Sequence, residues 1–400
     1  MSEELERLRA EVDRVDEEIL RRLNERARLA RAIGTLKMGQ AYRPEREAQV
    51  LRRIKEANPG PLSGETVAFV FREIMSACLA LERPITVAYL GPQGTFSERA
   101  ALKHFGIAAA ALPSPSIDEV FRAVESGAAD FGVIPVENST EGAVGRSLDL
   151  MSQTPMKICG EVVLRIHHHL MAKPTALRDH VMAKPTALGD HVMAKPTALG
   201  DHVMAKPTAL GDHVPAENSR KDLAGIRRIF SHGQSLAQCH EWLNAKVPNA
   251  ERVAVASNAE AARRAAEEAG SAAVAGEMAA EHYGLAVLAS NIEDEPDNTT
   301  RFLILGDYRP QRSGKDKTSL VLSARNRAGA VYEMLTPFAT RGVSMTKFES
   351  RPSRVAVWEY LFFVDIEGHR DEPNVAAALE EVGRIAGFIK VLGSYPAAVI

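Results

Sequence analysis

The stretch ITVAYLGPQGTFSERAALKHFG (85–106) marks the point where the pattern of the chain changes. It predicts a strand over 85–91 that ends in glycine, then a turn, then a helix over 96–106. The turn has glycines like a phosphate-binding loop, but it lacks the spacing and the lysine of one, so no nucleotide site is predicted. Pro84 separates the strand from purely helical sequence before it. An α/β region therefore begins at residue 85.

Strand and helix signals alternate after residue 106. FGVIPVEN (131–138) and KICGEVVLRIHHHLMA (157–172) predict further strands, and the alternation continues to TRFLILGDY (300–308). This order predicts an α/β region with a mostly parallel sheet in two lobes. After the polar stretch RPQRSGKDK (309–317), the signals follow in β-α-β-β-α-β order. That order predicts a ferredoxin-like α+β unit at the C-terminal end.

Three helices are predicted before residue 85. They cover 3–37, 45–57 with Pro44 at the start, and 63–82 with Ser63 as the N-cap. Apolar side chains recur at steps of three and four along the first helix. These positions are Leu5, Leu8, Val12, Val15, Ile19, Leu23 and Ala30. Residues 1–83 are thus expected to form an all-α domain.

Composition and charge narrow the class of protein. A chain of 400 residues with 45% hydrophobic and 25% charged residues is expected to form two to four globular domains. A net charge of −3 argues against a nucleic-acid partner. No apolar run reaches the length of a membrane span, and the first residues are charged, so a cytoplasmic protein is expected. Cys78, Cys159 and Cys239 lie far apart, which predicts reduced thiols.

The first helix carries cations that have two interpretations. On composition alone, Arg9, Arg26 and Lys37 are part of a solvated charged face. However, LRAEVDRVDEEILRRLNERARLARAIGTLK (8–37) followed by YRPEREAQVL (42–51) resembles the all-helical chorismate mutases. The resemblance implies a site that rearranges chorismate to prephenate. There Arg9 and Arg26 would bind the two carboxylates, Lys37 would donate to the ether oxygen, and Glu47 would hold a hydroxyl.

Helix geometry adds an expectation about assembly. Arg9 and Arg26 are seventeen residues apart in the sequence, roughly 25 Å along a helix. A substrate less than about 10 Å across cannot reach both from one helix that rises 1.5 Å per residue. If both serve one site, they come from two copies of the chain. We therefore expect a homodimer or a higher oligomer, with interlocked long helices and shared sites.

One position departs from the pattern of the mutases. Glu82 aligns where the best-known members carry glutamine, opposite the ether oxygen. A carboxylate there helps only when it is protonated and donates, so mutase activity is expected to improve as pH falls below neutral. Cys78 also stands where a hydroxyl would be expected.

Four motifs of the α/β region occur in an informative order. They are GPQGTFSERAA (91–101), PVENSTEGAV (135–144), SHGQSLAQC (231–239) and NTTRF (298–302). Together they resemble the prephenate dehydratases, over a domain of residues 85–306. The resemblance implies decarboxylation and dehydration of prephenate to phenylpyruvate, which requires help for a departing hydroxide.

The resemblance also implies roles for individual residues of this domain. Thr300 would place its hydroxyl on the leaving group. The cleft would be lined by Asn138, Ser139, Ser231 and Gln238. Arg301 is a candidate carboxylate anchor, although a basic residue flanking a strand is also often a structural ion-pair residue. Glu137 has a similar alternative as a structural acid.

RIHHHL (165–170) raises the question of a metal site. His167 and His169 would share one face of a strand, without His168. No Asp, Glu or Cys stands at a useful spacing, so structural histidines are predicted. No cofactor is implied anywhere in the chain.

Residues 317–400 resemble the ACT domains, which sense small molecules. RAGAVYEML (327–335) and ESRPS (349–353) are similar to the two motifs that hold phenylalanine in the regulatory domain of this enzyme. The resemblance implies an allosteric site formed by Gly329, Ala330, Val331, Glu349, Ser350, Arg351 and Pro352. Phenylalanine, as effector, would bind between paired ACT domains and favour a less active state.

An eleven-residue repeat interrupts the second lobe. MAKPTALGDHV occurs three times over Met182–Val214, after MAKPTALRDHV at 171–181. Proline in each copy excludes a continuous helix, and each copy offers too few apolar residues to form a core. Residues 171–214 are therefore expected to form a flexible insertion. A weakly ordered stack of turns and a metal array of His180, His191, His202 and His213 are the alternatives.

The three resemblances together imply a bifunctional enzyme of phenylalanine biosynthesis that acts on chorismate and prephenate and is inhibited by phenylalanine. The alternative from another class is a ligand-binding regulator without chemistry. Thr300, Arg301 and the mutase cations favour the enzyme, since a pure sensor does not need them. A third hypothesis is a dehydratase impaired by the repeat, which a large gain in rate on deleting Met182–Val214 would support.

Overall fold

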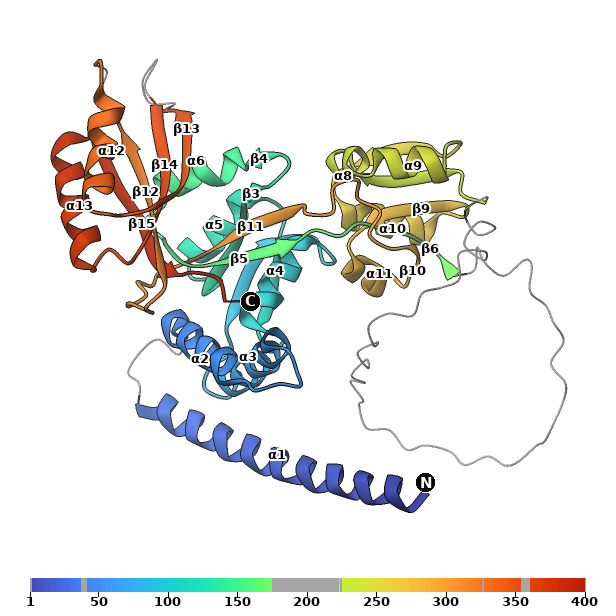
Figure 1. Ribbon diagram of the computed structural model, residues 1–400. Helices are drawn as coiled ribbons and strands as arrows, with labels where there is room; N and C mark the ends of the chain where they lie inside the picture. Colours follow the sequence, from blue (N-terminus) through green and yellow to red (C-terminus); the bar gives the residue numbers. More distant parts are fainter. Residues whose placement is uncertain are drawn as a thin grey trace, which may run out of the picture. The chain divides into compact units, whose positions relative to one another are not determined.

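A computed structural model describes residues 2–36, 42–174, 223, 225–325, 327–353 and 360–399 (Figure 1). Two compact units form: Met1–Ile166 with Asp297–Ile400, and His167–Pro296. The predicted fold class is confirmed, with an all-α domain, an α/β domain in two lobes and a ferredoxin-like α+β domain. Lys37 and residues 175–222 lie outside the described residues. The predicted insertion is therefore not described beyond residue 174, and its first residues, Met171 and Ala172, belong to a buried strand.

The N-terminal domain contains α1 (Ser2–Leu36), α2 (Pro44–Ala57) and α3 (Gly64–Ala80). The predicted starts are confirmed: Pro44 opens α2, and the Ser63 hydroxyl accepts from the N–H of Thr66 at 3.1 Å. One side of α1 leaves apolar side chains about half exposed. They are Leu5, Leu8, Val12, Val15 and Ile19, from 46% to 58% exposed. Their steps of three and four residues make a single stripe along the helix.

The first lobe of the α/β domain is built on a sheet in the order β2-β1-β3-β11-β5, with β4 paired to β3. The strands are β1 (Thr86–Leu90), β2 (Ala110–Ser114), β3 (Phe131–Asn138), β4 (Gly142–Ala143), β5 (Lys157–Arg165) and β11 (Thr299–Gly306). The helices are α4 (Phe96–Phe105), α5 (Ile117–Glu125) and α6 (Gly145–Gln153). β11 therefore lies between β3 and β5, inside the sheet.

The second lobe has its own sheet in the order β10-β6-β9-β7-β8. The strands are β6 (His169–Ala172), β7 (Arg228–His232), β8 (Glu251–Val255), β9 (Ser271–Ala275) and β10 (Ala286–Ala289). The helices are α8 (Gly233–Gln238), α9 (His240–Lys246), α10 (Asn258–Glu267) and α11 (Glu277–Tyr283).

The prediction of mostly parallel sheets is wrong. β1 is parallel to β2 and β3, but β11 is antiparallel to both β3 and β5. The chain leaves the first lobe at the end of β5 and returns at the start of β11, where Thr299 pairs with Arg165. Strands that leave and re-enter a sheet at the same end must run in opposite directions. In the second lobe, β6 is likewise antiparallel to β9 and β10.

The C-terminal domain has the predicted β-α-β-β-α-β order. Its elements are β12 (Asp316–Ser323), α12 (Ala330–Thr340), β13 (Met345–Pro352), β14 (Tyr360–Glu367), α13 (Pro373–Ile385) and β15 (Phe388–Pro396). The antiparallel sheet has the order β13-β14-β12-β15. One face, with Leu320 and Val364, packs with Met334 of α12. The opposite face, with Val321 and Phe363, joins the core of the first lobe.

Strand β11 serves two cores at once. Phe302 and Ile304 pack with Phe105 of α4, whereas Leu303 and Leu305 share a core with Tyr395 of the C-terminal sheet. Successive side chains of a strand point to opposite faces. Thr300 and Arg301, at the start of β11, must therefore point to opposite faces as well.

Candidate active sites

The helical domain brings several predicted mutase residues to one pocket. Arg26, Glu47, Cys78 and Glu82 line it, with Arg26 from α1 and the others from α2 and from α3 and its end. Arg9 does not line this pocket and is exposed on α1. Four further cations line the pocket that were not predicted from the sequence: Arg43, Arg46, Arg53 and Arg312. Arg43 and Arg46 lie within YRPERE, beside the predicted Glu47, and this position was the available signal.

Glu47 is in an unusual electrostatic position. Burial raises the pKa of its carboxyl to about 8, and the Arg72 guanidinium opposes that rise only in part. At neutral pH the protonated form therefore predominates, and this form can donate a hydrogen bond to a substrate oxygen.

Helix α1 closes one side of the same pocket. The Arg26 guanidinium contacts the Cys78 sulfur at 3.0 Å. Glu82 packs against α1, since a Cβ added at Gly34 would lie 2.8 Å from Oε2 of Glu82. Cys78 and Glu82 thus line the pocket beside α1. The catalytic roles of Arg9, Arg26, Lys37, Glu47 and Glu82 stay predictions.

Thr300 and Asn138 form the centre of the polar cluster on the first lobe. They are directly paired across β11 and β3, and Nδ2 of Asn138 donates to Oγ1 of Thr300 at 2.9 Å. Oδ1 of Asn138 accepts from the N–H groups of Thr140 and Glu141, each at 3.1 Å. The buried amide is fixed on both ends. A hydroxyl oxygen that accepts this bond can still donate its own hydrogen.

Two neighbours brace this pair. Ser139 exchanges two bonds with Thr299: its N–H donates to the Thr299 carbonyl, and its Oγ accepts from the Thr299 N–H, both at 2.9 Å. Asn298, fully buried, accepts from Nδ2 of Asn138 at 2.7 Å. Asn298 was not among the predicted site residues, although it opens the motif NTTRF.

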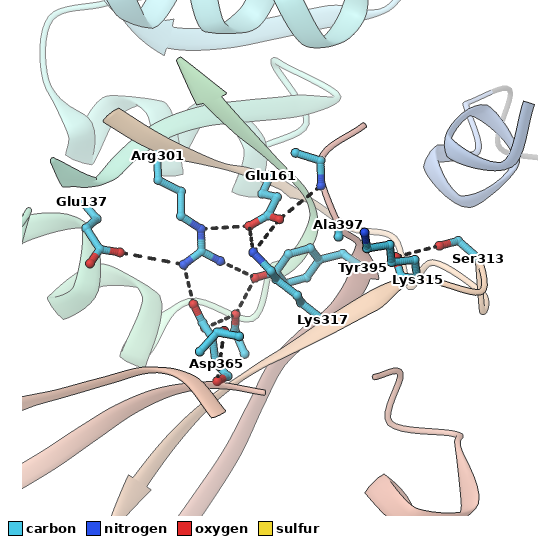
Figure 2. Close-up of polar contacts among 12 residues, drawn as sticks. Glu137, Glu161, Arg301, Ser313, Lys315, Lys317, Asp365, Tyr395 and Ala397 are labelled. Carbon is cyan, nitrogen blue, oxygen red and sulfur yellow. Dashed lines mark hydrogen bonds and ion pairs between the residues drawn. The ribbon is translucent and has the colours of Figure 1, made fainter. Parts of the chain in front are cut away.

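Arg301 points toward Asp365 and Tyr395 of the C-terminal domain (Figure 2). Its Nε donates to Glu161 at 2.9 Å, its Nη2 donates to the Tyr395 hydroxyl at 2.9 Å, and its Nη1 pairs with Asp365. Burial would lower the pKa of this guanidinium, but Tyr395, Asp365 and Glu161 together raise it above its ordinary value. The geometry favours the interpretation of Arg301 as a structural ion-pair residue over that of a substrate anchor.

The predicted residues of the second lobe differ in exposure, since Gln238 is only partly buried. Ser231 is fully buried, and its hydroxyl donates to the Val274 carbonyl at 2.7 Å. Asn258, missed by the sequence analysis, accepts from the Ser231 hydroxyl at 3.0 Å. Oε1 of Gln238 lies 2.9 Å from Nε2 of His168. Binding of substrate by Ser231 and Gln238 stays a prediction.

The histidines of RIHHHL have protein partners. Nδ1 of His167 lies 2.7 Å from Oε1 of Glu293, whose other oxygen accepts from the His168 N–H at 2.9 Å. Burial lowers the pKa of His168, which favours its neutral form. Within the described residues, no group of three or more His, Cys, Asp or Glu side chains could hold a metal ion.

The two predicted effector motifs lie on different parts of the C-terminal domain. Gly329 is the N-cap of α12 with a φ of 76°, in the left-handed region that favours glycine. Ala330 behind it is buried, and Val331 is partly exposed.

Strand β13 divides the second motif between its faces. Ser350 and Pro352 are exposed on the face that carries α12 and α13, since Ser350 pairs with Phe362. Glu349 and Arg351 point the other way, because neighbouring residues of a strand alternate. Nε of Arg351 donates to Asp149 of α6 at 3.2 Å. The strand's alternation therefore prevents all four from contacting one ligand through a single face.

None of the described helices has the length and apolar character needed to cross a membrane.

Models of three known families match the chain. Chorismate mutase type II matches residues 8–83, prephenate dehydratase matches 87–199 and 212–310, and the ACT domain matches 318–384. A Neisseria gonorrhoeae protein named bifunctional chorismate mutase/prephenate dehydratase is 52% identical over 97% of this chain and 96% of its own length. A Pseudomonas aeruginosa protein of the same name is 48% identical over 100% of this chain and 99% of its own.

A solved structure shares the fold of the α/β and C-terminal domains. It is a prephenate dehydratase from Arthrobacter aurescens in complex with L-Phe. The TM-score is 0.62 at 32% sequence identity, over 78% of this chain and 90% of that one.

Proposed function

The chain belongs to the bifunctional chorismate mutase/prephenate dehydratase family, and we propose that the side chains described above perform its two reactions. The first reaction rearranges chorismate to prephenate, and the second removes CO2 and water from prephenate to give phenylpyruvate. The observation that carries the second assignment is the bond from Asn138 to Thr300, which fixes a hydroxyl that can still donate.

For the mutase, Arg26 binds one substrate carboxylate in the pocket between α1, α2 and α3. Protonated Glu47 donates to a substrate hydroxyl, and Lys37 donates to the ether oxygen as negative charge develops there. Glu82 also lines this pocket and contributes as a donor when protonated. No covalent bond to the protein is needed, since the reaction proceeds by holding a flexible dianion in a reactive conformation.

The mutase site requires a second copy of the chain. Arg9 does not line the pocket of its own chain, and the apolar stripe of α1 is about half exposed. Pairing two long helices covers both stripes and brings Arg9 of one copy to the pocket of the other. The protein is therefore a homodimer or a larger oligomer with shared mutase sites.

For the dehydratase, Thr300 donates its hydroxyl hydrogen to the departing hydroxyl of prephenate. A threonine hydroxyl is a weak acid, so it stabilises the leaving group or relays a proton, and the aromatic ring that forms supplies most of the driving force. Asn138 and Ser139 hold β3 and the start of β11 in one arrangement around this hydroxyl. Ser231 and Gln238 are the residues of the second lobe that we assign to the prephenate site.

The C-terminal domain is the sensor that inhibits the dehydratase. We assign phenylalanine as its effector, supported by the ACT-family match and by the ligand named for the Arthrobacter structure. The α12 start at Gly329–Val331 and the exposed residues Ser350 and Pro352 of β13 offer it backbone and side-chain contacts. Glu349 and Arg351 belong to the same motif but face the first lobe.

The test is phenylpyruvate formation from prephenate by the purified full chain, with and without phenylalanine. Thr300→Ala should abolish turnover while leaving mutase activity intact. Thr299→Ala is the matched control, because that neighbouring side chain points to the opposite face of β11 and its backbone bonds remain. Turnover unaffected by Thr300→Ala would refute the assignment. No turnover by the unmodified protein, with mutase activity present, would favour a mutase attached to a binding lobe.

A further inference from the structure

Two strands of the first lobe carry catalytic groups on one face and charges on the other. Asn138 and Thr300 are paired on one face, and their neighbours Glu137 and Arg301 are paired on the opposite face. β11 lies inside the sheet, so movement of Arg301 along or across the strand moves Thr300, one peptide unit away. The register between β3 and β11 also shifts immediately after Arg301. At such a bulge the ladder is locally interrupted, so side-chain contacts have more influence on the strand's position.

The C-terminal sheet meets these charges with a polar face. Its strands alternate, and the face opposite to α12 and α13 carries polar side chains near Arg301. They are Lys317, Ser319, Lys347, Asp365 and Tyr395. The apolar members of the same face pack into the core of the first lobe. The two domains are thus joined by apolar packing with a charged cluster set into it.

The charged cluster is fully connected (Figure 2). Arg301 bonds to Glu161, Asp365 and Tyr395. Nζ of Lys317 lies 2.8 Å from Glu161, and the Ser319 hydroxyl bonds to both Asp365 and Tyr395, at 2.5 and 2.7 Å. Glu161, Asp365 and Tyr395 are nearly inaccessible to solvent.

A second contact reaches the partner strand. Nζ of Lys347 on β13 donates to Oε2 of Glu137 at 2.8 Å, and Glu137 directly precedes Asn138. Both members of the Asn138–Thr300 pair are therefore adjacent to a residue held by the C-terminal sheet. Four residues further along β13, Arg351 binds Asp149. The strand that carries the ESRPS motif is thus itself attached to the dehydratase lobe.

We propose that Asp365 and Tyr395 are positioning residues of the dehydratase: they hold Arg301 and, through the backbone of β11, the Thr300 hydroxyl. The C-terminal domain is then part of the structure that sets the dehydratase rate, in addition to sensing an effector. A ligand that displaces β13 acts on the same pair through Lys347 and Glu137. This last step rests on the proposed binding of phenylalanine, whereas the positioning role does not.

The experiment compares Asp365→Asn and Tyr395→Phe with Asp316→Asn in the full chain. Asp365→Asn keeps the shape and removes the charge that faces Arg301, and Tyr395→Phe removes one hydroxyl. Asp316 is the matched control: it is also a buried carboxylate of the C-terminal sheet, 5% exposed against 6% for Asp365. Its oxygens bond to Ser313 and Gly314 instead of the first lobe.

Dehydratase kcat and KM, mutase turnover and phenylalanine binding by calorimetry are measured on each variant. Asp365→Asn should lower dehydratase kcat about tenfold or more with KM nearly unchanged, because misplacement of a catalytic group acts on the chemical step. Tyr395→Phe should lower it by a smaller factor. Mutase turnover, measured on the same sample, reports the fraction of folded chain. Inhibition at saturating phenylalanine should weaken in both variants while phenylalanine still binds, and Asp316→Asn should change neither.

Dehydratase kcat and inhibition equal to the unmodified protein in both variants would overturn the proposal. So would equal losses in Asp316→Asn, since they would indicate a general effect on the C-terminal sheet. If Asp365→Asn also loses mutase turnover, Tyr395→Phe decides, because it retains the ring in the core. If the unmodified protein does not bind phenylalanine, the effector assignment fails, and the kcat comparison still tests the positioning role.

Discussion

Mutase sites shared between two chains can be tested by mixing two inactive variants. Arg9→Ala and Arg26→Ala each remove one carboxylate-binding guanidinium from every site of a homodimer. Along α1 the two residues are about 25 Å apart, at 1.5 Å per residue, and only Arg26 lines the pocket of its own chain. In a mixed dimer, one site receives Arg26 from the first variant and Arg9 from the second. The other site lacks both.

The expected recovery of mutase activity follows from the activity of each variant and from the fraction of mixed dimers. Loss of a bidentate ion pair to a carboxylate costs about 2–4 kcal/mol, so each variant alone should retain roughly a thirtieth to a thousandth of kcat/KM. Random pairing of equal amounts makes half of the dimers mixed, and each of these has one intact site of two. Mutase activity should therefore recover to about one quarter of the unmodified level.

The assay follows chorismate consumption after the two variants are co-expressed in equal amounts and purified together through one affinity tag that both carry, so that all pairings are retained. Dehydratase turnover on the same sample serves as the internal standard. A mixture of Arg9→Ala with the double variant Arg9→Ala/Arg26→Ala is the control, because no pairing there restores both arginines to one site. Activity that stays at the level of the separate variants would refute the shared site, as would full activity in a monomer.

Three further predictions concern single residues. The pKa of Glu47 is raised to about 8, so its protonated, donating form is lost as pH rises through that value. Mutase kcat/KM should therefore fall around pH 8. Glu47→Gln should flatten this pH profile of kcat/KM, measured by chorismate consumption. Gly393→Ala should lower the free energy of unfolding in urea by about 1–3 kcal/mol or more, because the added Cβ would lie 2.2 Å from a backbone oxygen of β5. Gly383→Ala in α13 is the control, because its added Cβ has only an ordinary contact. Arg301→Met should lower unfolding free energy by about 3–5 kcal/mol, since it leaves two buried carboxylates with one lysine, and an unchanged urea midpoint would contradict this.

Local signals in the sequence were enough to predict most of the elements. Pro44 and Ser63 act within one helical turn, so the starts of α2 and α3 could be predicted from neighbouring residues. The β-α-β-β-α-β order of the C-terminal domain follows from periodicity in the same way. Asn138 and Thr300 are 162 residues apart in the sequence, so periodicity could not predict that they lie together. The order of the motifs did indicate both as residues of one site.

Features that depend on strand direction and on the packing of domains could not be predicted. Nothing local to β11 shows that it runs antiparallel between β3 and β5. Alternation within TTRF does predict that Thr300 and Arg301 face opposite ways, but the partners of Arg301 come from residues 161, 365 and 395. Arg46 and Arg53 of α2 and the N-cap residue Arg43 line the mutase pocket and were missed for a related reason, because an exposed charged face has the same sequence pattern.

Apolar packing between the two sheets would stabilise their contact at least as well as the charged cluster at Arg301, so stability does not explain why the cluster is charged. Burying charges costs desolvation free energy that their mutual attraction only about offsets, so such a cluster adds little to stability. It does discriminate between geometries, because hydrogen bonds weaken steeply with angle, whereas apolar contacts change gradually when one surface slides over another. Leu303 and Leu305 lie in the apolar core that the two sheets share, whereas the bonds of Arg301 to Asp365 and Tyr395 require one arrangement of the sheets. For the proposed role of Thr300, a strand held in one geometry matters more than additional stability of the contact between the sheets.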